Sequence, residues 1–185
     1  MGNKGAETRE RLLEATQSLV EAVGYYGAGL NQVIADSGAP RGSLYFHFPG
    51  GKDQLVGESV RRAGQAISAD LRTLAEASPG AADFVTGMLR HLGDRLEESG
   101  WSKGCPVATV ALETAATSDA LQQVCSQVYR SWEADLRARL AGRPDADDLA
   151  VTVLALVEGA LLLARAHRDR EPLERVGRQI AALLG

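Results

Sequence analysis

Apolar side chains recur along the chain at helical spacing. Between residues 7 and 23 they fall three and four positions apart, as on one face of a helix, and the alternation typical of a half-buried strand is nearly absent from the sequence. Gly24 follows this first segment, Gly38 follows the second, and Pro49 begins a Pro-Gly-Gly break after the third. The pattern therefore predicts an all-α protein of about nine helices. The apolar positions of the first segment are Leu12, Ala15, Leu19, Val20 and Val23.

Prolines and a serine help to place the helix ends. Pro40, Pro106 and Pro172 suit first helical turns, where the missing N–H needs no partner, and Ser118 fits an N-cap. The expected helices cover residues 7–23, 30–37, 40–48, 52–76, 82–98, 106–117, 119–140 and 147–166, and a ninth opens at Pro172.

The segment APRGSLYFHFPGGKDQL, residues 39–55, concentrates aromatic side chains in a chain with only 5% Phe, Trp and Tyr. Leu44 and Phe48 lie four positions apart on the short third helix, so both should pack inward. Tyr45 instead carries its hydroxyl on another face. The expected packing partners in the first two helices are Leu12, Val33 and Ile34.

Two short helices joined by a tight turn make a helix-turn-helix, whose second helix enters the DNA major groove with its N-terminal residues at the base edges. Arg41 can donate a bidentate pair to guanine, Gly42 allows close backbone approach, and Ser43 can bond a base or a phosphate. The same turn also fits an ordinary helical core, and the pattern by itself leaves both interpretations open. The expected phosphate contacts are Tyr45, His47 and Lys52.

Net charge and missing motifs bear on which functions the chain can have. The net charge is −4, and residues 1–62 contain equal numbers of acidic and basic side chains, so a DNA-binding surface would have to come from the placement of charges. The sequence contains no P-loop or HExxH motif. Its histidines, His47, His91 and His167, are too scattered for a metal site. We therefore expect no enzymatic activity, no cofactor and no metal.

The chain looks cytoplasmic. Charged residues near the N-terminus leave no apolar signal region, and the longest apolar run, Leu149–Ala164, contains Glu158 and predicts a buried helix. The only two cysteines fit the reduced thiols of a cytoplasm. Cys105, at a helix start, fits either a redox-sensing thiol or a small capping residue, and Cys125 should be buried.

Residues 9–55 resemble the N-terminal domain of TetR-family transcriptional regulators. The most specific pieces are ADSG at residues 35–38, GSLYFHF at residues 42–48, and the following Lys52. A later piece, GCPVATVALE at residues 104–113, resembles the LmrA/YxaF-like branch of that family. The rest of the chain is similar to the family only in the number and length of its helices.

The resemblance implies a homodimeric repressor that binds a palindromic operator in double-stranded DNA and is released by a small hydrophobic effector. Residues 1–51 would form the helix-turn-helix DNA-binding domain, and residues 52–185 the ligand-binding and dimerisation domain. Asn31 and Gln32 become weaker phosphate contacts, whereas Gly29 stands where many relatives carry a hydroxyl cap. The alternative is a helical module that binds a small molecule without a specific operator.

The larger C-terminal part should supply the dimer interface and the effector pocket. Its apolar eighth and ninth helices would pair with a second copy, although the same pattern equally fits the core of a monomer. The positions are Leu149, Val153, Leu156, Ala160, Leu161 and Leu163 on the eighth helix, and Val176, Ile180, Leu183 and Leu184 on the ninth.

A mostly apolar pocket with a few polar groups is expected among the fourth to eighth helices. Most of these side chains fit an ordinary core as well. The pocket candidates are Met88, His91, Leu92, Trp101, Val110, Glu113, Val128 and Trp132.

Overall fold

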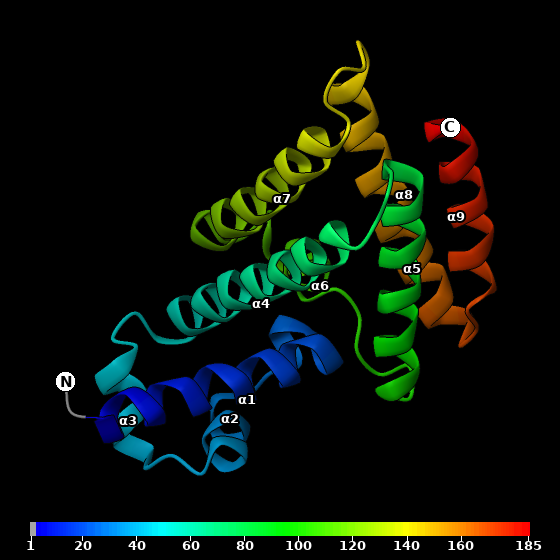
Figure 1. Ribbon diagram of the computed structural model, residues 1–185. Helices are drawn as coiled ribbons and strands as arrows, with labels where there is room; N and C mark the ends of the chain where they lie inside the picture. Colours follow the sequence, from blue (N-terminus) through cyan, green and yellow to red (C-terminus); the bar gives the residue numbers. More distant parts are fainter. Residues whose placement is uncertain (1–2) are drawn as a thin grey trace. The chain divides into compact units, whose positions relative to one another are not determined.

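A computed structural model describes residues 3–185, which form nine helices and no strand (Figure 1). This confirms the all-α fold expected from the apolar spacing. The helices are α1 (Asn3–Gly27), α2 (Leu30–Ser37), α3 (Arg41–His47), α4 (Gly51–Glu76), α5 (Ala81–Glu98), α6 (Pro106–Thr114), α7 (Asp119–Arg139), α8 (Ala146–His167) and α9 (Glu171–Leu184).

The helices belong to two compact units. The first unit comprises Met1–Gln65 and Pro106–Val128, and the second comprises Ala66–Cys105 and Tyr129–Gly185. The long helices α4 and α7 each contribute residues to both units. The proposed division of the chain into domains at residues 51 and 52 stays a prediction.

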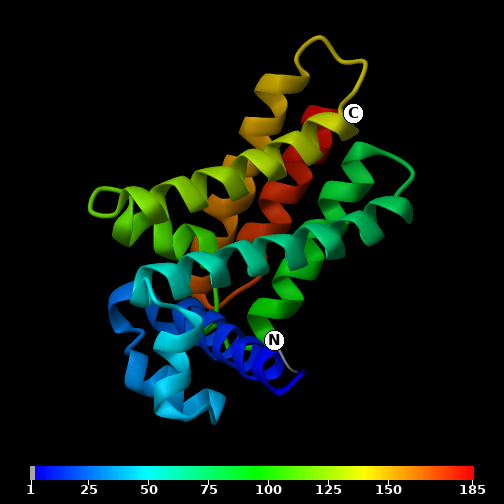
Figure 2. The same ribbon diagram turned by 90° about the vertical axis from the view of Figure 1, so that its left-hand side faces the viewer.

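The core of the first unit holds the N-terminal helices together. Helix α1 contacts α2, α3 and α6, and Figure 2 shows α1, α2 and α3 as one group beside the start of α4. Leucine, valine and phenylalanine side chains fill the space between them, and burying this apolar surface stabilises the group. The core residues are Leu12, Leu13, Val33, Ala39, Leu44, Phe48 and Leu55.

Near its end, α1 changes direction at Gly24, where φ is 76° and ψ is −179°. These angles are open almost only to glycine. The helix expected to end at this glycine therefore continues to Gly27 after a break. Val23, expected on the apolar face, is 51% exposed, whereas Leu12 and Val20 of the same face are buried.

The second unit is built around α5, α8 and α9, each of which contacts the other two. Among the described helices, α8 is the one that is long and apolar enough to cross a membrane by length and composition. One side of α8 packs in the core of this unit, whereas Val151, Leu156, Leu162 and Leu163 on its other sides are exposed, so α8 is not the fully buried helix that its apolar run predicted. The core of the unit includes Phe84, Met88, Leu89 and Leu96 of α5, Leu136 of α7, Val153, Val157 and Leu161 of α8, and Leu173 and Ile180 of α9.

Candidate nucleic-acid interface

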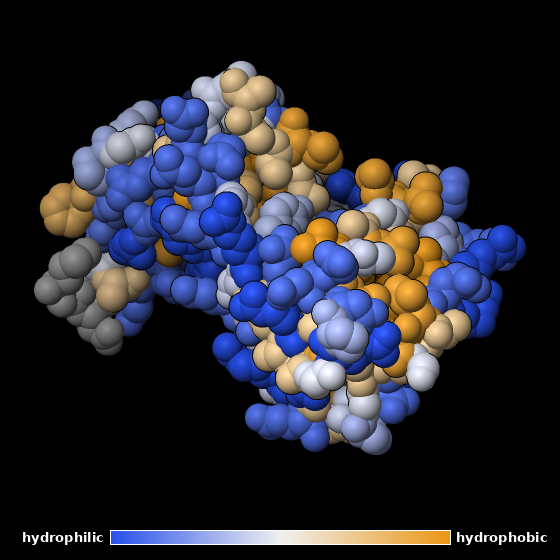
Figure 3. All heavy atoms as spheres, turned by 90° about the horizontal axis from the view of Figure 1, so that it is seen from above, coloured by the Kyte–Doolittle hydropathy of each residue, from blue (hydrophilic) through white to orange (hydrophobic). Residues whose placement is uncertain are grey.

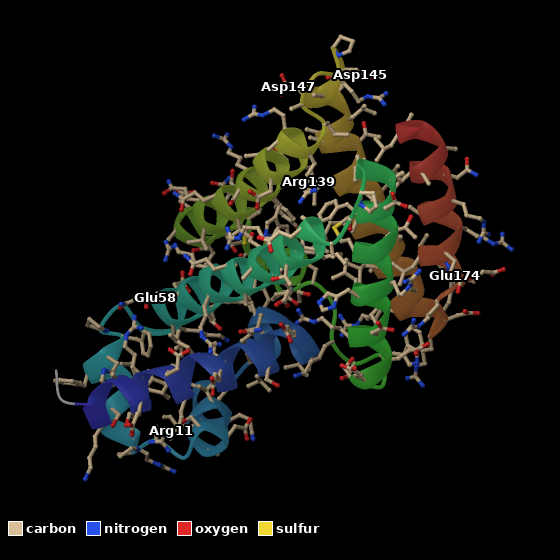
Figure 4. The ribbon with its side chains drawn as sticks, viewed as in Figure 1. Arg11, Glu58, Arg139, Asp145, Asp147 and Glu174 are labelled. Carbon is tan, nitrogen blue, oxygen red and sulfur yellow. The ribbon has the colours of Figure 1, made fainter. Side chains whose placement is uncertain are left out.

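Hydrogen bonds within the first unit fix the turn between α2 and α3. Gly38 ends α2 with φ 60° and ψ 20°, and its N–H donates to the Ala35 carbonyl. The Ser37 hydroxyl oxygen accepts a bond from the Ala39 N–H at 3.2 Å. Arg11, labelled on α1 in Figure 4, donates to the Ser37 carbonyl at 3.2 Å. Arg11 thus helps to set where α3 begins, a role that its spacing in the sequence does not indicate.

Leu44 and Phe48 anchor α3, and both side chains are 0% exposed. They lie in the core that α1 and α2 complete, which confirms the predicted inward pair. The guanidinium of Arg9 lies 5.0 Å from the centre of the Phe48 ring and is also paired with Glu58 of α4. Because these contacts come from several helices, α3 has little freedom to rotate about its axis.

The opposite face of α3 is open to solvent. Arg41, Gly42 and Tyr45 are exposed, while Ser43 and His47 are partly buried. Among residues 3–185, Arg41 takes part in no ion pair. Apart from the chain neighbours of Gly42 and the nearby backbone of α3, no heavy atom of these residues lies within 4 Å of the point where a Cβ on Gly42 would sit. A guanidinium and several hydroxyl groups are therefore free to meet a ligand on this face.

Lys52, in the first turn of α4, is held by an aromatic ring. Its Nζ is 4.4 Å from the centre of the Tyr25 ring, within the range of a cation–π interaction. Burial lowers the pKa of Lys52, and the charge of Asp53 opposes that shift. The Tyr25 hydroxyl donates to Asp53 at 2.6 Å, and burial and this bond raise the pKa of Tyr25 to about 12. Tyr25 and Asp53, which the sequence pattern did not single out, thus position Lys52.

The imidazole of His47 packs between Phe46 and Phe48, with ring centres 5.0 Å and 6.4 Å away. Its Nδ1 is buried without a hydrogen-bond partner. Any bond from His47 to a phosphate would therefore have to come from Nε2.

The start of α2 also faces solvent. Asn31 and Gln32 are exposed, and the Gln32 side chain donates to Asp36 at 2.6 Å. The Gly29 carbonyl accepts from the backbone N–H of Gln32 and Val33 at 3.0 and 3.1 Å. Gly29 is thus the N-cap, as predicted, and makes no side-chain cap bond.

Ion pairs neutralise several basic residues of the first unit. Arg62 contacts Glu10 at 2.5 Å and Glu14 at 3.0 Å. Arg9 is paired with Glu58, which Figure 4 labels on α4. These pairs tie α1 to α4, so neither arginine adds uncompensated positive charge to the open face of α3.

The eight pocket candidates are divided between the units. Met88, Val110, Val128 and Trp132 are buried, and the other four are partly buried. The second unit has a groove of about 410 Å³ between α5 and α9, but none of the candidates lines it. The effector pocket therefore stays a prediction. Met88, His91, Leu92, Trp101 and Trp132 belong to the second unit, and Val110, Glu113 and Val128 to the first.

Glu113 of α6 has a structural role at the end of α1. One carboxylate oxygen accepts a bond from the Tyr26 N–H at 2.9 Å. The carboxylate also fills the space beside Gly24, where an added Cβ would overlap it. Glu113 thus caps the broken helix from a position 87 residues away in the chain.

Residues 100–104 read GWSKG and match the GxSxG spacing of hydrolases, in which the serine lies at a strand-to-helix turn. Here the segment follows α5, and no strand occurs among the described residues. The Ser102 hydroxyl donates to the Ser99 carbonyl at 2.7 Å. The match therefore does not indicate a nucleophile.

The two cysteines lie in different surroundings. Cys125 is 2% exposed, as expected, and burial raises its pKa to about 11. Cys105 is partly buried and hydrogen-bonded to Glu158, whose pKa is raised by burial. No group of three or more His, Cys, Asp or Glu side chains within residues 3–185 could hold a metal ion.

Known proteins resemble both parts of the chain. Residues 12–58 match the family described as bacterial regulatory proteins, tetR family, and residues 81–179 match the LmrA/YxaF-like transcriptional regulator C-terminal domain. The HTH-type transcriptional regulator LmrA of Bacillus subtilis is 35% identical over 182 residues, which cover 96% of this chain and 97% of that protein. The uncharacterised regulator YxaF of the same strain is 31% identical over 96% of this chain and 95% of its own length. The crystal structure of a TetR transcriptional regulator from Chloroflexus aurantiacus matches with a TM-score of 0.85 and 27% identity, over 98% of this chain and 96% of that one.

Proposed function

The chain belongs to the TetR family of DNA-binding bacterial transcriptional regulators, and we propose that it is a repressor that binds a palindromic operator as a homodimer and leaves it when a small hydrophobic effector binds. Members of this family are regulators rather than enzymes. The open face of α3 carries the proposal, because Arg41 and Tyr45 stand exposed on a helix that Leu44 and Phe48 anchor from behind. Action on bacterial DNA places the protein in the cytoplasm.

The proposed contacts divide into those that read bases and those that hold the backbone. Arg41, Gly42 and Ser43 lie in the first turn of α3, which a helix-turn-helix brings to the base edges. The other proposed contacts meet phosphates. Contacts to phosphates set the position and orientation of the protein on DNA but carry no sequence information. The phosphate contacts are Tyr45, His47 and Lys52, with Asn31 and Gln32 as weaker ones.

Removing Arg41 and removing Lys52 should have different consequences. Arg41→Ala should cost about 1–3 kcal/mol for each half-site and relax the preference for one base, because a bidentate contact to guanine is lost. Lys52→Ala should weaken binding to all DNA sequences similarly and reduce the dependence of affinity on salt. Both changes are measured as binding to operator variants at several salt concentrations. Unchanged affinity and selectivity in both variants would contradict the proposed docking of α3.

An apolar stripe on the surface of α8 supports a homodimer. Leu156, Gly159 and Leu163 follow one another at helical spacing. The two leucines are 38% and 49% exposed, and Gly159 faces open space. Leu183 of α9 is also 45% exposed. Exposed apolar patches are visible on one face of the molecule in Figure 3. Pairing of this stripe with a second copy about a two-fold axis would remove it from water.

The remaining apolar positions on α8 and α9 have a different role. Leu149, Val153, Ala160, Leu161 and Ile180 are buried within the second unit itself. These buried positions are not part of the proposed interface, which therefore contains fewer residues than the apolar pattern of α8 predicts.

Leu163→Asp should shift the protein toward the monomer. A carboxylate within the stripe would have to lose its hydration in the dimer, and we expect self-association to weaken at least about tenfold, which is about 1.4 kcal/mol. Sedimentation at several concentrations measures the effect. Leu112→Asp is the matched control, because Leu112 is 81% exposed on α6, outside the proposed interface. If both variants stay dimeric, the stripe on α8 is not the interface.

Release by an effector requires that the effector bind the DNA-free conformation more tightly than the DNA-bound one. Two bound copies would place their recognition helices in half-sites about 34 Å apart or a multiple of that distance. Helix α4 continues from the first unit into the second, so a change at its C-terminal part could alter the separation of the two recognition helices. Within the second unit, the proposed effector contacts are Met88, His91, Leu92, Trp101 and Trp132.

Selection of bound sequences from a random DNA library tests the function directly. The purified protein should enrich a palindrome, and Arg41→Ala should alter or lose it. Apolar compounds are then screened for release of the selected operator, and a promoter carrying that operator shows whether binding represses transcription. If ligand-stripped, refolded protein enriches no sequence, the chain is better explained as a small-molecule-binding module without a specific operator.

A further inference from the structure

The recognition helix α3 exposes an apolar side chain that none of the proposed contacts uses. Phe46 is 75% exposed, more than Tyr45 at 61%. At the helical rotation of about 100° per residue, Phe46 points roughly 200° away from the buried Leu44. Its ring therefore stands at the centre of the face that α3 turns away from the core.

Single exposed apolar residues are common on protein surfaces. Phe46 differs because of its neighbours on the same short helix. Arg41, Gly42 and Tyr45 are exposed with it, and none of these residue types is needed for the core. Side chains that read bases in the major groove include both hydrogen-bonding and apolar groups, and this face of α3 exposes both kinds.

Gly42 has no side chain and lies one turn before Phe46, and we call the space that this leaves beside the Phe46 ring the notch. Residues four positions apart lie above one another on a helix, and the longer side chain leans toward the preceding turn. Apart from Gly42, its two chain neighbours and the nearby backbone of α3, no heavy atom lies within 4 Å of the point where a Cβ on Gly42 would sit. The Phe46 ring contacts the His47 ring edge to face, with centres 5.0 Å apart and planes at 79°. This contact supports the ring from one side and leaves the space over Gly42 open.

We propose that Phe46 reads a thymine in the operator through the 5-methyl group of that base. This inference rests on the proposed function, because it requires α3 to lie in the major groove. Thymine is the one base with a methyl group in that groove, and apolar side chains, phenylalanine among them, are the groups that contact it. The methyl group would enter the notch between Gly42 and Phe46, where it removes apolar surface of both partners from water.

The test compares two DNAs that differ by this methyl group alone. The operator selected by the wild-type protein is synthesised with deoxyuridine in place of one conserved thymidine at a time, at symmetric positions in both half-sites. At one such position, we expect the wild-type protein to bind about fourfold more weakly for each methyl group lost, which corresponds to about 0.8 kcal/mol. Phe46→Ala should bind the two DNAs equally, and Phe46→Leu should keep part of the preference. The two proteins and two DNAs form a cycle that isolates the contact.

The controls separate this inference from the proposed function. Arg41→Ala should bind more weakly but keep the methyl preference, because its side chain is not part of the notch. Equal binding of both DNAs by the wild-type protein, full preference in Phe46→Ala, or an operator without a conserved thymine would each overturn the inference while specific binding stands. If the wild-type protein enriches no sequence at all, the inference is lost together with the proposed function.

Discussion

Phe48→Ala should destabilise the first unit by about 3–5 kcal/mol, the usual cost of removing a fully buried phenylalanine. Phe48 is 0% exposed and lies in the core that joins α1, α2 and α3. The loss should also free Arg9 from the ring that it covers. Urea unfolding followed by circular dichroism measures the change over all helices. Tryptophan fluorescence reports the second unit, because Trp101 and Trp132 both belong to it.

We expect the dichroism of the Phe48→Ala variant to change at lower urea than its tryptophan fluorescence. The matched control is Phe46→Ala, which deletes the same side chain two positions earlier, where it is 75% exposed. That control should change stability by no more than about 0.5 kcal/mol, as most surface substitutions do. Equal effects of the two substitutions would show that α3 is not anchored as described.

Gly24→Ala should destabilise the first unit by about 2.5–6 kcal/mol, because two costs combine. A residue with a Cβ is strained at φ 76° and ψ −179°, by about 1–3 kcal/mol. The new methyl group would also displace the Glu113 carboxylate from the Tyr26 N–H, and a hydrogen bond to a charged group contributes about 1.5–3 kcal/mol. Urea unfolding and hydrogen exchange of the α1 amides measure the result.

Two further variants identify the cause of that loss. Gly38→Ala is the milder control, because Gly38 is left-handed at φ 60° but its Cβ would meet only Arg11 at an ordinary 3.5 Å. It should cost about 1–2 kcal/mol. Glu113→Ala combined with Gly24→Ala should cost less than the sum of the single variants, because the displaced carboxylate is already absent. Strict additivity would rule out the overlap with Glu113.

The helical elements could be predicted because their signals are local. Apolar spacing along a helix, left-handed glycines and prolines in first turns act within a few residues. The same local logic predicted that Leu44 and Phe48 would point inward and that Arg41 and Tyr45 would stay exposed. The central part of the candidate DNA-binding site could therefore be predicted from the order of the residues alone.

Apolar spacing alone was a weaker guide in the second unit. On α8 it did not separate Val153, which is buried, from Leu163, which is 49% exposed. Both are aliphatic side chains on a helix that is apolar on nearly every side. Only the positions of α5 and α9 decide which of them the unit covers.

By itself, the sequence determined that this protein is helical, where most of its helices begin and end, and which short helix can meet DNA. The tertiary structure decided which distant side chains meet at the end of α1 and the start of α4. Glu113 caps the break at Gly24, and Tyr25 and Ser118 both bond to Asp53 beside Lys52. Tyr26 and Glu113 are far apart in the chain and come together when α6 packs against α1, and Asp53 on α4 meets its two partners in the same folded unit. Helical periodicity fixes which side of each helix is apolar, but it does not specify which helices will meet.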